Sequence, residues 1–318
     1  MLDDFMLNNL IVAISAVVPI FVLMSIGAVI KWRRWLNEEE LAHMNRMVFR
    51  VFFFCMMFYS LYTSDPSNSL RPRLMLFGVC GVLTVFALSM WLVPKVEPEN
   101  RRRGVIVQAL FRSNFVLIGV PIVANIFGDQ NIAVATAMIA VIIPMYNILG
   151  VVALETFRGG SFKLMPLFVE VMKNPMILGA IAGALCMLIG IKIPAPVLKP
   201  IGQISAATTP VALLILGASF KLGATHEHRR QLIGAVAGRL IVVPGILLSI
   251  AIALGFRGVE LVTLIGTFCT PCAVVSYAMA QQLGGDAELA GSCVVFTSAF
   301  ACLTIFCWIF MFKTLGFF

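Results

Sequence analysis

Charged side chains are scarce in this sequence of 318 residues. Asp, Glu, Lys and Arg together make up 12% of it, whereas 60% of the residues are hydrophobic. A soluble domain carries about 25% charged residues, so the composition excludes a soluble protein and predicts an integral membrane protein. About ten apolar stretches are long enough to cross a bilayer, at 7–30, 41–62, 73–94, 103–127, 131–154, 166–190, 197–220, 231–255, 258–283 and 289–312.

Signatures of enzyme chemistry are also missing. The sequence contains no Walker loop, dinucleotide fingerprint, HExxH zinc motif or GxSxG nucleophile elbow. We therefore expect no enzyme activity, no ATP hydrolysis and no cofactor or metal. His226 and His228 in the string HEHRR are interpreted as part of a solvated loop, because no further metal ligand is near them in the sequence.

Carboxylates are absent from the middle of every predicted span. Glu155 and Glu170 lie near span ends, and the other acidic residues lie in loops or termini. This distribution argues against a proton relay built on paired Asp residues and against a carboxylate-rich sodium site. H+ or Na+ stays open as a coupling ion, with Na+ held by carbonyls and amides.

Lys and Arg gather in alternate loops. With the N-terminus outside, the inner loops carry about twice as many of them as the outer loops, which favours both termini on the extracytoplasmic side of the membrane. The net charge of +8 is then a topology signal, and nucleic-acid binding is not expected.

Two of the predicted spans are interrupted near their middles. One contains ALFRSNFVLIGVP at 109–121 and the other LIGTFCTPCAVVS at 264–276. Unwound backbone at membrane depth is tolerated only where it is buried in protein or lines a watery cavity. Two such interruptions at corresponding places of two halves indicate the binding site of a transporter.

The predicted spans divide into two sets of five. We expect a first repeat at 1–155, a short cytoplasmic linker at 156–165 and a second repeat at 166–318. Pro19 and Gly27 in the first span correspond to Pro175 and Gly183 in the sixth. Because each half has an odd number of spans, the second half must insert upside down relative to the first. The sequence therefore predicts an all-α membrane protein with an inverted repeat.

The two interruptions supply most of the candidate binding residues. Asn114, Gly119 and Pro121 form the first, with an ordinary proline kink as the alternative. The second contains Thr270, Pro271, Cys272 and Ser276. The pair Cys269 and Cys272 is better explained by small residues at a helix crossing than by redox or metal chemistry.

Three further polar residues lie deep within the spans. Arg112 and Arg239 are costly in hydrocarbon and would balance the charge of an anionic substrate. The alternative is that they reach the inner water layer or cap backbone carbonyls. Asn147 either faces the same pocket or binds a neighbouring helix.

Several strings resemble the auxin efflux carrier family. NFVLIGVPI at 114–122 is similar to its fourth-helix signature, and the strings at 173–183, 193–220 and 270–298 are similar to blocks of bacterial members. The resemblance implies broken, crossing fourth and ninth helices, as in bile-acid/sodium symporters, with Asn114 and Pro121 at the first crossover and Pro271 at the second. It also implies small organic anions as substrates, such as auxin, malonate or malate.

We therefore expect a secondary transporter of small organic anions that works by alternating access. Helices 1, 2, 6 and 7 would form a scaffold, with dimerisation through it, and helices 3–5 and 8–10 a core that moves within the lipid bilayer. A membrane sensor of the same fold that binds its ligand without transport is the alternative. An intramembrane enzyme is a weaker one, because no nucleophile and base are paired at depth.

Overall fold

The structure is a computed structural model that describes residues 18–63, 71–128, 132–158, 169, 172–220 and 228–318. Within these residues the chain is helical, and the one extended pairing is an isolated bridge between two residues. The expected all-helical class is thereby confirmed. The beginning of the first expected span, most of the linker at 156–165 and His226 lie outside the described residues.

Among the described residues, six helices are long and apolar enough to cross a membrane. They are α2 (Glu38–Met47) continued through η1 (Val48–Phe52) into α3 (Phe53–Tyr62), α4 (Pro72–Val96), α7 (Ile132–Arg158), α10 (Ala195–Ser219), α12 (Arg229–Ala237) continued through η5 (Gly238–Val242) into α13 (Val243–Ala253), and α16 (Ala287–Thr314). The η segments are single π-helical turns, which are frequent at functional sites.

The remaining helices are shorter. They are Val18–Trp32, α5 (Asn100–Phe111), η3 (Phe115–Gly119) with α6 (Val120–Phe127), α9 (Pro175–Ile189), α14 (Gly258–Cys269) and α15 (Val275–Gln282). Each helix or helix pair overlaps one apolar stretch of the sequence, and several extend a few residues beyond it. The two interrupted stretches are the ones that contain two helices in place of one.

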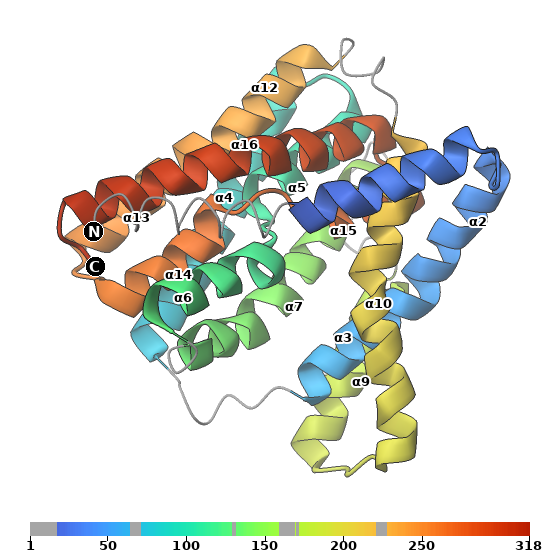
Figure 1. Cartoon of the computed structure of the whole chain (residues 1–318), viewed down its shortest axis with the longest axis horizontal. Coiled ribbons are helices and arrows are strands. Elements are labelled where there is room, and N and C mark those ends of the chain that lie inside the picture. The colour runs from blue at the N-terminus through green and yellow to red at the C-terminus, as the bar shows by residue number, and fades with distance from the viewer. Residues whose placement is uncertain (1–17, 64–70, 129–131, 159–168, 170–171, 221–227) are drawn as a thin grey trace.

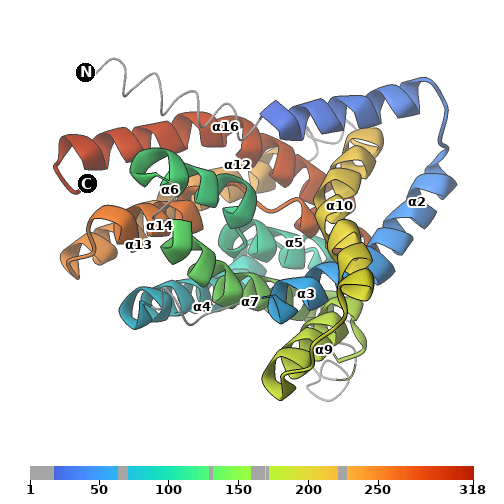
Figure 2. The same cartoon turned by 60° about the horizontal axis from the view of Figure 1, so that its bottom comes forward.

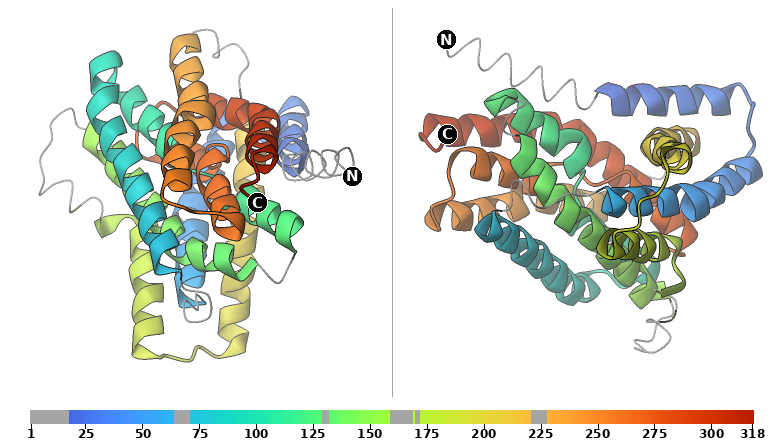
Figure 3. Two further views of the ribbon diagram at one scale, coloured as in Figure 1. Left: turned by 90° about the vertical axis from the view of Figure 1, so that its left-hand side faces the viewer. Right: turned by 90° about the horizontal axis from the view of Figure 1, so that it is seen from below.

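The helices form two groups (Figure 1). In the first group helix α3 packs on both α9 and α10, and these three extend together away from the rest, as the side view in Figure 3 also shows. Helix Val18–Trp32, which lies against α10, belongs to the same group. In the larger group α4, α5 and α7 pack with one another, and α14 packs on both α13 and α16.

Glycines let backbones of the first group approach closely. A Cβ on Gly27 of helix Val18–Trp32 would lie 2.1 Å from the carbonyl oxygen of Leu214 in α10. A Cβ on Gly183 of α9 would lie 2.5 Å from the carbonyl oxygen of Phe58 in α3. No side chain fits at either distance, so these two glycines set the spacing of the helix pairs, as small residues do in membrane proteins.

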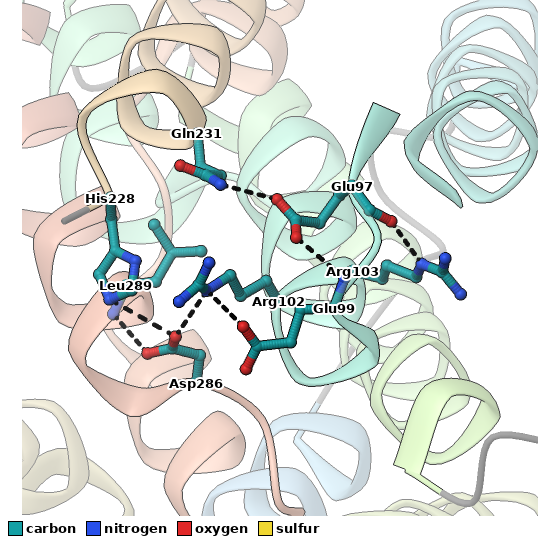
Figure 4. Close-up of polar contacts among 8 residues, drawn as sticks. All are labelled: Glu97, Glu99, Arg102, Arg103, His228, Gln231, Asp286 and Leu289. Carbon is teal, nitrogen blue, oxygen red and sulfur yellow. Dashed lines mark hydrogen bonds and ion pairs between the residues drawn. The ribbon is translucent and has the colours of Figure 1, made fainter. Parts of the chain in front are cut away.

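Asp286 ties three elements together at one end of the larger group (Figure 4). Its carboxylate lies 3.3 Å from Nε of Arg102 in α5 and 3.5 Å from Nε2 of His228, just before α12. It also accepts a hydrogen bond of 3.0 Å from the backbone N–H of Leu289, and thereby caps the N-terminus of α16. An acidic N-cap satisfies an unpaired N–H and favours the positive end of the helix dipole.

Glu97 holds the neighbouring turn between α4 and α5. Its side chain accepts hydrogen bonds from Nε2 of Gln231 at 2.8 Å and from the backbone N–H of Glu99 at 3.0 Å. Its backbone carbonyl accepts one from Nε of Arg103 at 2.7 Å. Glu97 is buried, and the bonds from Gln231 and from the N–H of Glu99 provide the partners that its carboxylate requires.

The interpretation of His228 as a solvated loop residue is wrong. Its side chain is buried, with 3% of the residue exposed, and its Nε2 faces Asp286. In the sequence it lies beside Arg229 and Arg230, which are exposed, and the sequence does not reveal its contact with the distant Asp286.

The cluster around Asp286 predicts a measurable loss of stability. Asp286→Ala should lower the free energy of unfolding by about 1–3 kcal/mol, because it removes the cap of α16 and leaves Arg102 without this partner. Asp286→Asn keeps an oxygen for the Leu289 N–H and should cost less. Thermal unfolding of the purified protein in detergent measures both, and a melting temperature of Asp286→Ala equal to that of the wild type would contradict this role.

Candidate functional site

The two interrupted helices cross at their breaks. Helix α5 ends at Phe111 and helix α14 at Cys269, and the chain resumes as η3 at Phe115 and as α15 at Val275. Between them, Ser113 and Cys272 form an isolated antiparallel bridge. The backbone N–H of Asn114 donates a hydrogen bond of 2.8 Å to the carbonyl of Pro271. Each break thus supplies partners for the backbone of the other, as membrane depth demands.

The first break is shorter than the sequence indicates. The prediction extends it from Asn114 to Pro121, but only 112–114 lie outside a helix, and Gly119 and Pro121 are helical. Pro121 has no N–H to donate, and it follows directly after the π-helical turn in which the N–H of Val120 reaches back to the carbonyl of Phe115. The wider turn accommodates the missing donor, so the proline does not break the helix.

The second break occurs where the sequence predicts it. Thr270 is extended, with φ −73° and ψ 152°. This conformation is the one that a residue preceding a proline favours. The Thr270 hydroxyl donates a hydrogen bond of 2.9 Å to the carbonyl of Gly266, one turn earlier. The N–H of Cys272 donates one of 3.0 Å to the Thr297 hydroxyl of α16.

Gly119 allows the two broken helices to touch. Helices α6 and α14 lie side by side in Figures 1 and 2, and a Cβ on Gly119 would lie 2.9 Å from both the Cα and the carbonyl oxygen of Gly266. It would also lie 2.3 Å from Cδ2 of Phe115. Gly119 is therefore a packing residue of the crossover, and Gly266 is its partner, which the sequence analysis did not single out.

A cavity of about 930 Å³ lies against the crossover. Among the predicted site residues, Arg112, Asn114, Pro121 and Asn147 line it. The other residues of its wall come mostly from helix Val18–Trp32 and helices α3, α7 and α10, so the cavity lies between the two groups of helices. Among the described residues that line it, none is Asp or Glu.

Not every predicted site residue reaches this cavity. The wall does not include Gly119, Thr270, Pro271, Cys272, Ser276 or Arg239. Ala273 and Val275 are the residues of the second break that face the space. The breaks thus contribute unequally, and the first supplies the polar side chains.

Asn114 is a buried residue of the cavity wall. The residue is 7% exposed, and its Nδ2 has no hydrogen-bond partner among the described residues. Leaving a buried donor unsatisfied costs about 1–3 kcal/mol. A group that fills the cavity and accepts this hydrogen bond would recover that free energy.

Arg112 is buried beside Asn114 and does not extend to water. It is 3% exposed, and its guanidinium donates hydrogen bonds to Oδ1 of Asn147 and to the sulfur of Met279 in α15. The Nδ2 of Asn147 donates a hydrogen bond of 2.9 Å to the carbonyl of Ile143. Asn147 thus combines the two expected alternatives, because it lines the cavity and also hydrogen-bonds within the protein.

Arg239 is fully buried at the opposite side of the crossover. Its Nε donates a hydrogen bond of 2.8 Å to the carbonyl of Thr270, and its Nη2 donates one of 3.2 Å to the carbonyl of Thr267. Its Nη1 donates to the carbonyls of Leu110 and Phe111 at 3.2 and 3.3 Å. Arg239 therefore caps the C-terminal ends of α5 and α14 together, which is the alternative that the sequence left open.

The C-terminal and N-terminal ends of the half-helices lie in different surroundings. The C-terminal ends of α5 and α14, where unpaired carbonyls carry partial negative charge, meet Arg239. The N-terminal ends of η3 and α15, where N–H groups carry partial positive charge, contribute Asn114, Phe115, Val116 and Val275 to the cavity wall. The cavity side of the crossover is therefore electropositive.

The sequence analysis missed several polar groups of the site. The Ser113 hydroxyl donates a hydrogen bond of 3.1 Å to the hydroxyl of Tyr146, which in turn donates one of 3.3 Å to the carbonyl of Thr267. Both Ser113 and Tyr146 line the cavity, as do Tyr59, Ser60, Ser205 and Thr209. Ser113 and Tyr146 each adjoin a predicted site residue, so their position next to Asn114 and Asn147 is the signal that could have found them.

The close crossing predicts that Gly119 tolerates no side chain. Gly119→Ala should lower the free energy of unfolding by about 1–3 kcal/mol, because its Cβ overlaps the backbone of Gly266. Gly234→Ala in α12 is the matched control, since no atom lies within 4 Å of its new Cβ. Thermal unfolding in detergent compares the two, and equal melting temperatures would contradict the crossing.

Comparison with known proteins identifies the class. A family model described as membrane transport protein matches residues 12–168 and 161–309. An uncharacterized transporter of Methanothermobacter thermautotrophicus is 23% identical over 299 residues, which cover 92% of this chain and 96% of that protein. One of Methanocaldococcus jannaschii is 21% identical over 306 residues, which cover 93% and 98%. The family match confirms the resemblance to the auxin efflux carriers, and it identifies a multi-pass membrane transporter and not an enzyme. The chain therefore belongs to the membrane transport protein family.

Proposed function

We propose that this protein is a secondary transporter that moves a small organic anion across the cytoplasmic membrane at the crossover of its broken helices. The observation that carries the proposal is the buried Nδ2 of Asn114, a residue of the cavity wall, which has no hydrogen-bond partner in the described part of the chain. A carboxylate accepts such a hydrogen bond, and a hydrogen bond to a charged group is stronger than one between neutral groups.

The charges around the cavity favour an anion. Arg112 contributes a guanidinium to the wall, and within the described residues two of its five N–H groups have partners. The N-terminal ends of η3 and α15 add partial positive charge, and helix N-termini bind carboxylates and phosphates readily. A monocarboxylate or dicarboxylate such as malonate, malate or an auxin-like acid would satisfy these groups.

Equivalent contacts in the two halves support the inverted repeat. Gly27 and Gly183 are 156 residues apart in the sequence, and so are Leu214 and Phe58, the residues whose carbonyls they approach. The antiparallel bridge between Ser113 and Cys272 fits the same arrangement, because the two broken helices then run in opposite directions. The repeats would be residues 1–155 and 166–318.

Alternating access fits a cavity that lies between two groups of helices. In this proposal helix Val18–Trp32, α2–α3, α9 and α10 form the scaffold, through which two copies would dimerise. The other helices form a core that carries Arg112 and Asn114. The cavity is lined by Tyr59 and Thr63 at the end of α3, which lies on the extracytoplasmic side if both termini are outside.

The role of Asn114 predicts a specific loss of transport. Asn114→Asp should weaken transport of the preferred anion about tenfold to hundredfold, because it replaces a donor with a negative charge that repels a carboxylate. Uptake of labelled malonate, malate and an indole acid into proteoliposomes measures the effect. Asn125→Ala, on the exposed face of the same half-helix, is the matched control and should transport like the wild type.

Two outcomes would decide against the proposal. Wild-type uptake by Asn114→Asp would exclude the amide from the site. Binding of one of these anions to the purified protein without accumulation in proteoliposomes would favour a membrane sensor with the same fold.

A further inference from the structure

The carbonyl groups around Arg239 resemble the ligand set of a bound cation. Four backbone oxygens, from Leu110, Phe111, Thr267 and Thr270, accept its hydrogen bonds at 2.8–3.3 Å. They come from two different half-helices, and Arg239 itself comes from a third element, η5. The side chain is fully buried, and besides these oxygens it interacts with the hydroxyl of Tyr146.

Transporters with broken helices use such oxygens to hold coupling ions. Unwound carbonyls and the C-terminal ends of half-helices coordinate Na+ in these proteins, while the N-terminal ends face the anionic part of the substrate. Here the N-terminal ends face the cavity, and the C-terminal ends face a guanidinium that is part of the chain.

We propose that the Arg239 guanidinium is a built-in cation, which occupies the position between the two half-helices where a mobile coupling ion would otherwise bind. Removal of this side chain then leaves a latent cation site. The inference rests on the proposed function for its consequence in transport, but the cation site itself is a property of the crossover alone.

A fixed guanidinium differs from a bound ion in one consequential way. Arginine stays protonated in proteins, so its charge is constant throughout a transport cycle. Neither Na+ nor H+ is then exchanged at this position when the protein changes conformation. The sequence left open that carbonyls at the breaks hold sodium, and in this proposal the Arg239 guanidinium takes the place of that ion. The movement of an anion should then follow the membrane potential.

Thermal stability tests the cation site independently of transport. Arg239→Ala opens the oxygen cluster, and low millimolar guanidinium or Na+ should raise the melting temperature of this variant relative to choline. The same additions should leave the wild type unchanged. Arg239→Met is the matched control, because it fills much of the same space without charge and should show no response. A loss of stability in Arg239→Ala that no small cation restores would overturn the inference.

Transport supplies the second measurement. Uptake of labelled malonate, malate or an indole acid by the wild type should be the same in Na+ and in choline, and Arg239→Lys should keep this independence because it retains a cation. Arg239→Ala should transport about tenfold more slowly in choline and recover with guanidinium. A wild type that requires Na+ overturns the built-in cation and leaves the proposed function intact. If the wild type moves none of these anions, the proposed function fails, and the stability measurement still decides the cation site.

Discussion

A backbone polar group inside a bilayer must find a partner within the protein, and this constraint shapes the whole structure. Interrupting a helix at membrane depth releases several N–H and C=O groups at once. In this protein two interruptions are placed against each other, so that the N–H of Asn114 bonds the carbonyl of Pro271 and Ser113 bridges Cys272. The close contact of Gly119 with Gly266 makes this pairing geometrically feasible.

The crossing also separates charge. Arg239 collects the carbonyl ends of α5 and α14, whereas the N–H ends of η3 and α15 face a cavity that also holds Arg112 and the amide of Asn114. One face of the crossover is thereby closed by the protein's own cation, and the other is left electropositive. In the proposed function this face receives the anion. The polarity of the helices supplies most of its positive charge, and the described residues of the cavity wall include no acidic side chain.

Much of this arrangement could be predicted from the sequence. Length and hydropathy located the helices, because they act locally along the chain. Proline with small and polar residues located the second interruption, whereas the first lies at 112–114, before the predicted Gly119 and Pro121. Side-chain direction could not be predicted in the same way. His228 points inward to Asp286, Arg239 points to carbonyls, and Thr270 and Ser276 do not face the cavity. These outcomes depend on contacts between residues that are far apart in the sequence. The periodicity of hydrophobic residues along the chain carries no information about such contacts.

An experimental structure of the protein with a bromine-labelled aromatic carboxylate would test the central claim most directly. Anomalous scattering from bromine would place the ligand, and the density would place its carboxylate. The account predicts that the carboxylate lies within hydrogen-bonding distance of Nδ2 of Asn114 and near Arg112, beside the N-terminal ends of η3 and α15. A ligand bound outside this cavity, or one whose carboxylate points away from Asn114, would contradict it.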